Sequence, residues 1–291
     1  MRAFKDYHPI VNLIYFLAVI GFSVVFMHPV CIAISLSCAL VYSVILRGRR
    51  AVVLSLGMML PLFIFTALLN PVFNHAGATV LAYLPDGNPL TLESLLYGLC
   101  SAGMLVSVIC IFSCFGTVVS GEKFIYLFGR ILPSIALLIK MTFRFVPLFA
   151  REIKEVSDAQ KGIGKGENTS LLQKARSGIS VLSVMITKSL ENAVETASSM
   201  KSRGYGSGKR TAFSNYKFSS SDGTILGATV LLFALILFGA ALGENSAQFF
   251  PKIKITPITW ENVEFFIAYF ILSALPMVIE IKEVWRWKKS R

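Results

Sequence analysis

Long apolar runs separated by short polar stretches dominate the hydropathy pattern of this chain. Six of them have roughly the 20 mostly apolar residues that a membrane-spanning helix needs, namely Ile10–Met27, Pro29–Leu46, Ala51–Leu69, Glu93–Ser120, Thr224–Leu242 and Asn262–Ile281. A more polar region, residues 121–223, separates the first four from the last two. The pattern predicts an all-α polytopic membrane protein with about six transmembrane helices and long helices in the middle region.

The middle region reads as two helices. The first is predicted to run from Pro133 to Gln160 and to end at glycines 162, 164 and 166, and Asn168–Ser170 then supply a cap for the second, Leu171–Met200. Apolar side chains recur every three or four residues along the second helix and predict one stripe: Leu172, Ala175, Ile179, Leu182, Ile186, Leu190, Ala193, Val194 and Ala197. The stripe either packs within its own domain or receives a partner helix. Gly204 stands where a helix C-cap favours glycine.

Two other segments fit neither the spans nor the two middle helices clearly. Asn70–Leu92, with two Asn-Pro steps, predicts a turn-rich loop. Ile131–Ala150 is apolar enough to resemble a seventh span, but Lys140 and Arg144 near its middle would be costly at the bilayer centre. We therefore expect a helix at the membrane surface or beneath the bundle.

The distribution of charge gives the orientation. The net charge is +12, and residues 122–217 hold 16 basic against 7 acidic residues. If the N-terminus lies inside, internal segments carry every Lys and Arg except Lys252 and Lys254, as the positive-inside rule requires. Both termini and the middle region are therefore expected in the cytoplasm. The predicted domains are residues 1–120, a coupling-helix domain 121–223, and residues 224–291.

Composition agrees with a membrane protein, since 55% of the residues are hydrophobic and the mean hydropathy is +0.67. The five cysteines lie in apolar runs and read as small buried hydrophobes rather than metal ligands or disulfides. Arg2 and Lys5 before the first run resemble a secretory signal. That run is too long and lacks a cleavage site, so we expect a retained span.

The sequence offers no catalytic constellation. Residues 204–211 resemble a phosphate loop, but Arg203 and Arg210 occupy positions that need glycine and Ser or Thr, and a helix precedes the glycines. The three histidines lie far apart, without metal-ligand spacing. The spans hold almost no ionisable residue, unlike most transporters that work alone. We therefore expect a non-catalytic protein without cofactor or metal. A stand-alone secondary transporter, using polar backbone groups, stays an alternative.

Three stretches carry a resemblance to a known family, and they are Asn70–Thr79 with Gly87–Leu95, Arg144–Leu148 with Ala159–Gly164, and Met200–Thr211. With them, the chain resembles the transmembrane T component of energy-coupling factor (ECF) transporters, the EcfT/CbiQ-like family. The resemblance implies a prokaryotic cell-membrane subunit that couples two ABC-type ATPases to a separate membrane-embedded S component, which binds a vitamin or a metal.

The resemblance also implies where the ATPases bind, because each of two coupling helices ends in an Ala-Arg-Gly-like motif. The second motif corresponds to Ser202, Arg203 and Gly204. The first departs from the pattern, because Gly162, Ile163 and Gly164 stand in its place and Lys161 is the nearest cation; Arg144 is a further candidate.

An arginine at a helix C-terminus complements the helix dipole and can bind a partner carboxylate with two hydrogen bonds. The alternative from another class is a membrane-anchored scaffold whose basic helices bind anionic lipid. Few aromatic residues accompany the basic ones, which argues against nucleic acid as the partner.

Overall fold

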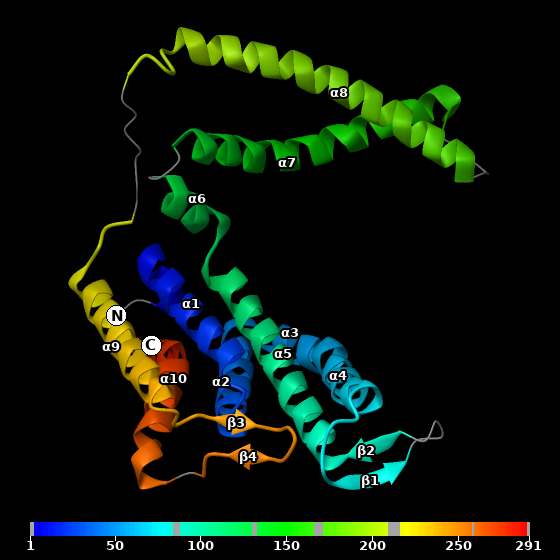
Figure 1. Ribbon diagram of the computed structural model, residues 1–291. Coiled ribbons are helices and arrows are strands. Elements are labelled where there is room, and N and C mark those ends of the chain that lie inside the picture. The colour runs from blue at the N-terminus through cyan, green and yellow to red at the C-terminus, as the bar shows by residue number, and fades with distance from the viewer. Residues whose placement is uncertain are drawn as a thin grey trace. The chain divides into compact units, whose positions relative to one another are not determined.

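The computed structural model describes residues 3–83, 88–129, 133–165, 171–208, 216–257 and 259–289 (Figure 1). The chain forms two compact units, unit 1 with Met1–Phe124 and Tyr216–Arg291, and unit 2 with Ile125–Asn215. Nearly all of the described secondary structure is helical, apart from two short hairpins. The all-α prediction is therefore confirmed.

Unit 1 is a bundle of apolar helices. Its helical elements are η1 (Phe4–Asp6), α1 (Pro9–Val25), α2 (Pro29–Arg47), α3 (Arg49–Leu54), the π-helical η2 (Ser55–Met59), α4 (Leu60–Phe73), α5 (Leu92–Val118), α9 (Ser220–Ala241) and α10 (Trp260–Lys289). Helix α6 (Gly121–Gly129) begins in unit 1 and continues into unit 2. Prolines begin α1 and α2, and His8 and His28 cap them, each ring accepting a backbone N–H two residues on.

Five described helices are long and apolar enough to cross a membrane, and they are Pro29–Arg47, Ala51–Phe73, Leu92–Val118, Ser220–Ala241 and Asn262–Arg286. The remaining predicted span forms α1, which has 17 residues and so lies at the short end of the range for a transmembrane helix. Each of the six predicted runs is thus an apolar helix. The segment predicted as a surface helix is not among the five.

Helix α5 is the centre of the bundle, because it packs on α1, α2 and α4, while α10 packs on α2 and α9. Small residues permit the close approaches. A Cβ at Gly98 would lie 2.6 Å from the carbonyl oxygen of Ala67, and a Cβ at Gly103 would lie 2.8 Å from Ile32.

The predicted loop Asn70–Leu92 is partly wrong, because α4 continues through Asn70 and Pro71 to Phe73. Pro71 has no N–H to donate to the carbonyl four residues earlier, that of Ala67. This oxygen faces Gly98 of α5, where the missing Cβ leaves room for it. The helix therefore tolerates the proline through its contact with α5.

The rest of that segment contains a hairpin instead of irregular turns. Strand β1 (Val80–Tyr83) pairs antiparallel with β2 (Pro89–Thr91). Buried Glu93, at the start of α5, accepts hydrogen bonds from the backbone N–H and the hydroxyl of Thr79, at 3.2 and 2.9 Å. Gly77 has a φ of +147°, and a Cβ there would meet the Glu93 carboxylate at 2.6 Å. A second hairpin, β3 (Ala247–Gln248) and β4 (Lys254–Ile255), precedes α10.

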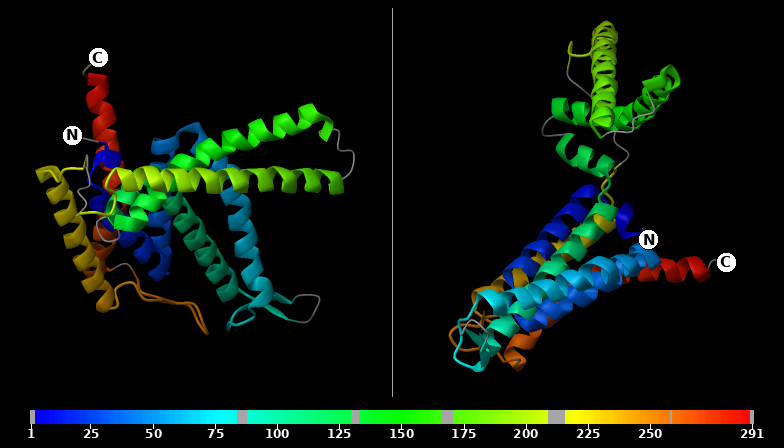
Figure 2. Two further views of the ribbon diagram at one scale, coloured as in Figure 1. Left: turned by 90° about the horizontal axis from the view of Figure 1, so that it is seen from above. Right: turned by 90° about the vertical axis from the view of Figure 1, so that its right-hand side faces the viewer.

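Unit 2 contains two long helices that run antiparallel, α7 (Pro133–Gln160) and α8 (Leu171–Ser202) (Figure 2). Both predicted helices are confirmed. The predicted break is wrong in its first part, because Gly162 and Gly164 lie in a π-helical turn, η3 (Lys161–Lys165), that continues directly from α7. Gly166 and the predicted cap Asn168–Ser170 lie outside the described residues.

Candidate functional site

The C-terminus of α8 is fixed by a two-bond cap. The N–H of Tyr205 donates to the carbonyl of Met200 at 3.1 Å, and the N–H of Gly204 donates to that of Lys201 at 3.0 Å. This is the Schellman arrangement, and Gly204 has the left-handed conformation that it requires, with a φ of +75°. The predicted capping glycine, Gly204, is confirmed, and α8 ends at Ser202, two residues beyond the predicted Met200.

Arg203 is therefore held at a defined position beside the last carbonyl groups of α8. Its side chain is exposed, and no ion pair to it occurs among the described residues. The neighbouring Ser202 hydroxyl donates to the Ser199 carbonyl at 2.9 Å, within the helix. A cation at this end of a helix is stabilised by the helix dipole and can still bind an external carboxylate.

The first motif has a different local structure. Lys161 pairs with Asp158, one turn earlier, at 3.2 Å, and both side chains are more than half exposed. Ile163 is 78% exposed, and Gly162 has open space around it. Because α7 and α8 are antiparallel, this motif and Arg203 lie at opposite ends of the helix pair (Figure 1). Arg144, exposed on α7, is separated from Lys161 by more than four turns of helix.

The contact between α7 and α8 is polar, which the sequence analysis missed. Glu152 of α7 forms an ion pair with Lys188 of α8 at 3.2 Å. The amide of Gln160 donates to the hydroxyl of Ser180 at 3.1 Å. Met185, 5% exposed, is the one buried apolar residue among the described part of unit 2. We call these five residues the α7–α8 contact.

A sequence signal for this contact does exist. The less exposed described positions of α8 also recur every three or four residues, and in the order of the chain they are Ser177, Ser180, Val181, Met185, Ser189, Asn192, Thr196, Ser199 and Met200. They are mostly small or polar. The apolar stripe gives the stronger periodic signal in the sequence of α8.

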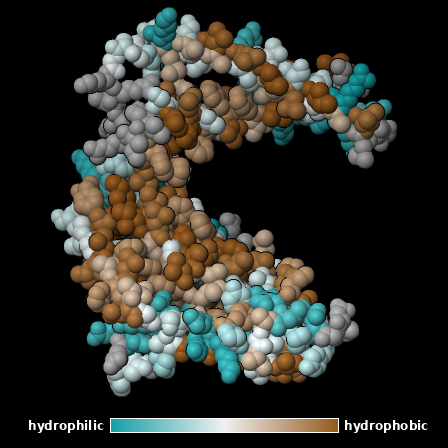
Figure 3. Space-filling view, viewed as in Figure 1, coloured by the Kyte–Doolittle hydropathy of each residue, from teal (hydrophilic) through white to brown (hydrophobic). Residues whose placement is uncertain are grey.

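The predicted stripe of α8 is exposed instead of packed on α7. Its large members are between 57 and 82% exposed, and they are Leu172, Ile179, Leu182, Ile186, Leu190 and Val194. Figure 3 shows hydrophobic residues gathered over the surface of α8 as well as over unit 1. The alternative in which the stripe covers its own helical partner is therefore wrong for these residues.

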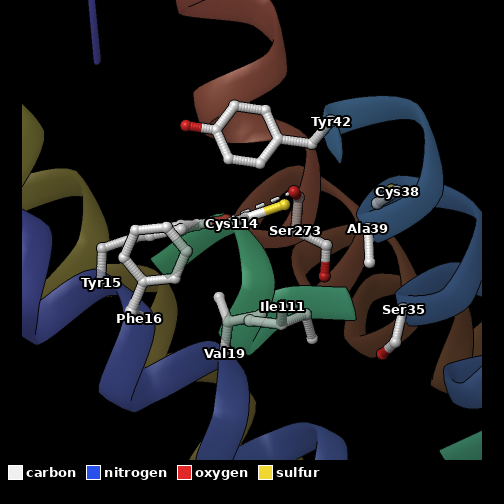
Figure 4. Close-up of a pocket in the computed structure, with 10 residues that line it drawn as sticks. All are labelled: Tyr15, Phe16, Val19, Ser35, Cys38, Ala39, Tyr42, Ile111, Cys114 and Ser273. Carbon is white, nitrogen blue, oxygen red and sulfur yellow. Dashed lines mark hydrogen bonds between the residues drawn. The ribbon is translucent and has the colours of Figure 1, made fainter. Parts of the chain in front are cut away.

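Unit 1 contains a cavity between α1, α2, α5 and α10 (Figure 4). Its volume is about 20 Å³, enough for a water molecule and far too small for a vitamin. It is lined by Tyr15, Phe16, Val19, Ser35, Cys38, Ala39, Tyr42, Ile111, Cys114 and Ser273. Among the described residues, no group of three or more His, Cys, Asp or Glu side chains could hold a metal ion.

Five helices that can span a membrane, together with an exposed pair of long amphipathic helices, define a polytopic α-helical membrane protein. Residues 5–213 match the family described as CbiQ, cobalt transport protein. The chain belongs to this family, which confirms the resemblance to EcfT/CbiQ-like transmembrane components.

Individual relatives match a shorter part of the chain. The energy-coupling factor transporter transmembrane protein EcfT of Lactobacillus helveticus is 34% identical over 106 residues, 36% of this chain and 38% of that protein. The EcfT of Bacillus selenitireducens is 32% identical over 120 residues, 39% of this chain and 44% of its own. An uncharacterized protein of Mycoplasma pneumoniae is 36% identical over 105 residues, 35% of this chain and 24% of its own. The chain thus spans less than half the length of each of these relatives.

Proposed function

We propose that this chain is the energy-coupling transmembrane subunit of an ECF-type uptake transporter. It connects two cytoplasmic ABC-type ATPases to a separate S component in the membrane, which binds a vitamin or a metal. Residues 121–223 act as the coupling domain, both chain termini face the cytoplasm of a prokaryotic cell, and the chain itself hydrolyses no ATP. The family match supports the class of protein, and the geometry of α8 supports its role.

The observation that carries the proposal is Arg203 at the capped end of α8. The two-bond cap holds its backbone, the side chain is exposed, and no acidic partner occupies it among the described residues. In this proposal Ser202, Arg203 and Gly204 bind one ATPase. The π-helical turn with Lys161, Gly162, Ile163 and Gly164, at the other end of the helix pair, binds the second ATPase, with Arg144 assisting.

The first motif is expected to contribute less than the second. Lysine presents a point charge, without the planar fork with which arginine binds a carboxylate. Lys161 is also already paired with Asp158, so binding an external carboxylate requires that ion pair to open.

Exposed apolar surfaces support an S component as the membrane partner. In the apolar 18-residue stretch of Ala51–Phe73 only 7% of the residues are buried, against 50% in that of Asn262–Arg286, and the stripe of α8 is exposed. Surface of this kind needs either lipid or another apolar protein. The cavity of about 20 Å³ is too small for a vitamin, which favours a separate subunit for binding such a solute.

Capture of the ATPases tests the proposal. The tagged chain, extracted in mild detergent from cells that contain ABC-type ATPases, should retain them, and Arg203→Ala should reduce the retained amount by about tenfold or more, as expected for loss of a bidentate charge pair. Arg203→Lys should give an intermediate loss. Arg151→Ala, an exposed cation on α7, is the matched control and should change capture less than twofold.

Equal retention by wild type and Arg203→Ala would contradict the proposed role of α8. Retention of anionic lipid without any ATPase would favour the scaffold. Uptake of solute by the purified chain alone, in vesicles, would favour a secondary transporter.

A further inference from the structure

The chain crosses between its two units twice, and the same short segment binds both crossings. It leaves unit 1 after Phe124 and returns at Tyr216. Residues 3–12, here called the N-terminal segment, contact a buried lysine just before the exit and a buried aspartate just after the return. All of these contacts lie within unit 1.

At the exit, Lys123 in the first turn of α6 is 5% exposed. Its ammonium group donates to the backbone carbonyl of Lys5. With the amide of Asn12 oriented so that its nitrogen donates to the Phe4 carbonyl at 3.2 Å, the amide oxygen accepts from the same ammonium group at 2.7 Å. Burial lowers the pKa of Lys123, and the charge of Asp6 partly opposes that shift.

At the return, Asp222 in the first turn of α9 is 1% exposed. One of its carboxylate oxygens accepts from the backbone N–H of His8 at 2.9 Å. The other accepts from the backbone N–H of Ser219 at 2.7 Å, which caps α9. The ring of His8 also contacts that of Phe218, with centroids 5.4 Å apart. One side chain therefore joins the start of α9 to the N-terminal segment.

The N-terminal segment is itself anchored in the core. Phe4 is fully buried, and its ring packs against four others at centroid distances between 5.2 and 6.5 Å, those of Tyr7, Tyr15, Phe16 and Tyr42. Tyr15 and Phe16 belong to α1, and Tyr42 belongs to α2. The backbone atoms that bind Lys123 and Asp222 are thus fixed to the bundle.

If the N-terminal segment only covered the end of the helix bundle, apolar residues alone would be sufficient. A buried ammonium group and a buried carboxylate are costly unless they are hydrogen-bonded, and here the backbone groups of Lys5 and His8 in the N-terminal segment supply two of the bonds. Burial raises the pKa of Tyr216 at the return crossing, and the charge of Glu122 at the exit adds to that shift. Both crossings therefore depend on hydrogen bonds to the N-terminal segment.

We propose that the N-terminal segment clamps both crossings to the bundle, so that Lys123 and Asp222 are positioning residues for coupling. This inference rests on the proposed function. A displacement of unit 2 is transmitted to the membrane helices only if the two chain crossings, after Phe124 and before Tyr216, keep their positions in unit 1. The hydrogen bonds of the N-terminal segment to Lys123 and Asp222 restrict local movement at both crossings.

Substitution at His8 tests the return crossing. His8 has φ −56° and ψ 135°, and Tyr7 before it is extended, so the backbone accepts proline. His8→Pro removes the N–H that binds Asp222, whereas the matched variant His8→Ala loses the ring and keeps the N–H. Hydrogen exchange of the full chain in nanodiscs should become about tenfold faster at residues 216–223 in His8→Pro than in His8→Ala, as expected for loss of a hydrogen bond to a charged group.

Substitution at Lys123 tests whether the crossings are coupled. Lys123→Met should accelerate exchange both at residues 121–124 and at residues 216–223, by about threefold or more at the second site, because both depend on one segment. Lys217→Met, the same substitution at an exposed lysine, should leave both unchanged. Acceleration confined to residues 121–124, or equal exchange in the two His8 variants, would overturn the clamp.

A transport assay tests whether the clamp contributes to coupling. In the reconstituted complex, His8→Pro and Lys123→Met should lower uptake by about tenfold relative to their controls and keep ATPase capture within twofold. Unchanged uptake with altered exchange would overturn the positioning role. If the wild-type chain captures no ATPase at all, the proposed function fails, while the exchange results still decide whether the clamp exists.

Discussion

Helices of unit 1 meet through aromatic and small side chains, whereas α7 and α8 of unit 2 meet through an ion pair, an amide–hydroxyl hydrogen bond and Met185. In unit 1 a cluster of buried apolar residues packs around Phe4 and Tyr269, although other apolar residues of this unit are exposed. In unit 2 the apolar stripe faces outward along α8. The difference teaches that close side-chain packing fixes the helices of unit 1, whereas the described part of the α7–α8 pair depends mainly on polar contacts.

The largest effect is expected from disrupting the packed apolar core of unit 1. Phe4→Ala should destabilise unit 1 by about 4 kcal/mol, because a fully buried ring leaves a cavity. Unfolding of the purified chain in detergent, induced by heat or by denaturant, measures the loss of stability. Phe143→Ala on α7, where the ring is 56% exposed, is the control and should change stability by less than about 0.5 kcal/mol. Similar losses in the two variants would mean that unit 2 is as tightly packed as unit 1.

A smaller effect is expected at the α7–α8 contact. Met185→Ala should destabilise the helix pair by about 2 kcal/mol, the low end for a buried methionine, since polar neighbours already share the contact. Hydrogen exchange at residues 150–160 and 180–190 measures this. Leu182→Ala, at a position 57% exposed, should leave exchange unchanged. If Leu182→Ala had the larger effect, the stripe and not the contact would hold the pair together.

The cap of α8 comes next. Gly204→Ala should cost about 1 kcal/mol, because the φ of +75° strains any residue with a Cβ. Faster exchange at residues 199–205 and weaker ATPase capture should accompany it. Gly208→Ala, where a Cβ meets nothing within 4 Å, is the control. Unchanged exchange in Gly204→Ala would show that the cap does not fix the position of Arg203.

The Glu152–Lys188 ion pair should contribute about 0.5 kcal/mol, because the Lys188 side chain is 46% exposed. A double-mutant cycle with Glu152→Ala and Lys188→Ala measures the coupling energy, which should fall as salt is raised. The more exposed pair Lys161–Asp158 should show a smaller coupling energy. A larger value for that pair would mean that the contact between α7 and α8 gains nothing from its lower exposure.

The smallest effect concerns pH. Burial lowers the pKa of His8, and Asp222 opposes that shift less strongly. The neutral ring is therefore favoured in the folded chain, so its contribution to stability is present above the ordinary pKa of about 6.5 and is lost as the pH falls below it. Unfolding of unit 1 at pH 7.5 and 5.5 measures the change. His8→Asn, which keeps a capping side chain, should remove this part of the pH dependence; an unaltered pH profile would contradict it.

Much of the fold could be predicted, because spans of about 20 apolar residues give a strong signal and the helices of unit 2 have clear periods. The end of α8 was predictable for a local reason, since Gly204 satisfies a backbone requirement that sequence reveals directly. The course of α4 through Pro71 was not, because it depends on the space left by Gly98, 27 positions further along the chain.

Within the candidate site, Arg203 and Lys161 could be named from the sequence, but their placement at opposite ends of the helix pair required the direction of α8. The partners of Lys123 and Asp222 lie far away in the sequence, and two of the contacts use backbone atoms of Lys5 and His8. A pattern of residue types does not record which backbone atom a buried charge will meet. The roles of the motif residues in binding ATPases stay predictions.

The hydrogen bond between His8 and Asp222 joins residues 214 positions apart. A ribosome finishes the N-terminus long before it makes α9, and chains fold from the N-terminal side as they emerge. The backbone N–H of His8 therefore lacks Asp222 as its acceptor until all of unit 2 has been synthesised. The bond between His8 and Asp222 therefore forms only after unit 2 has been made, and a chain released before Asp222 cannot form it.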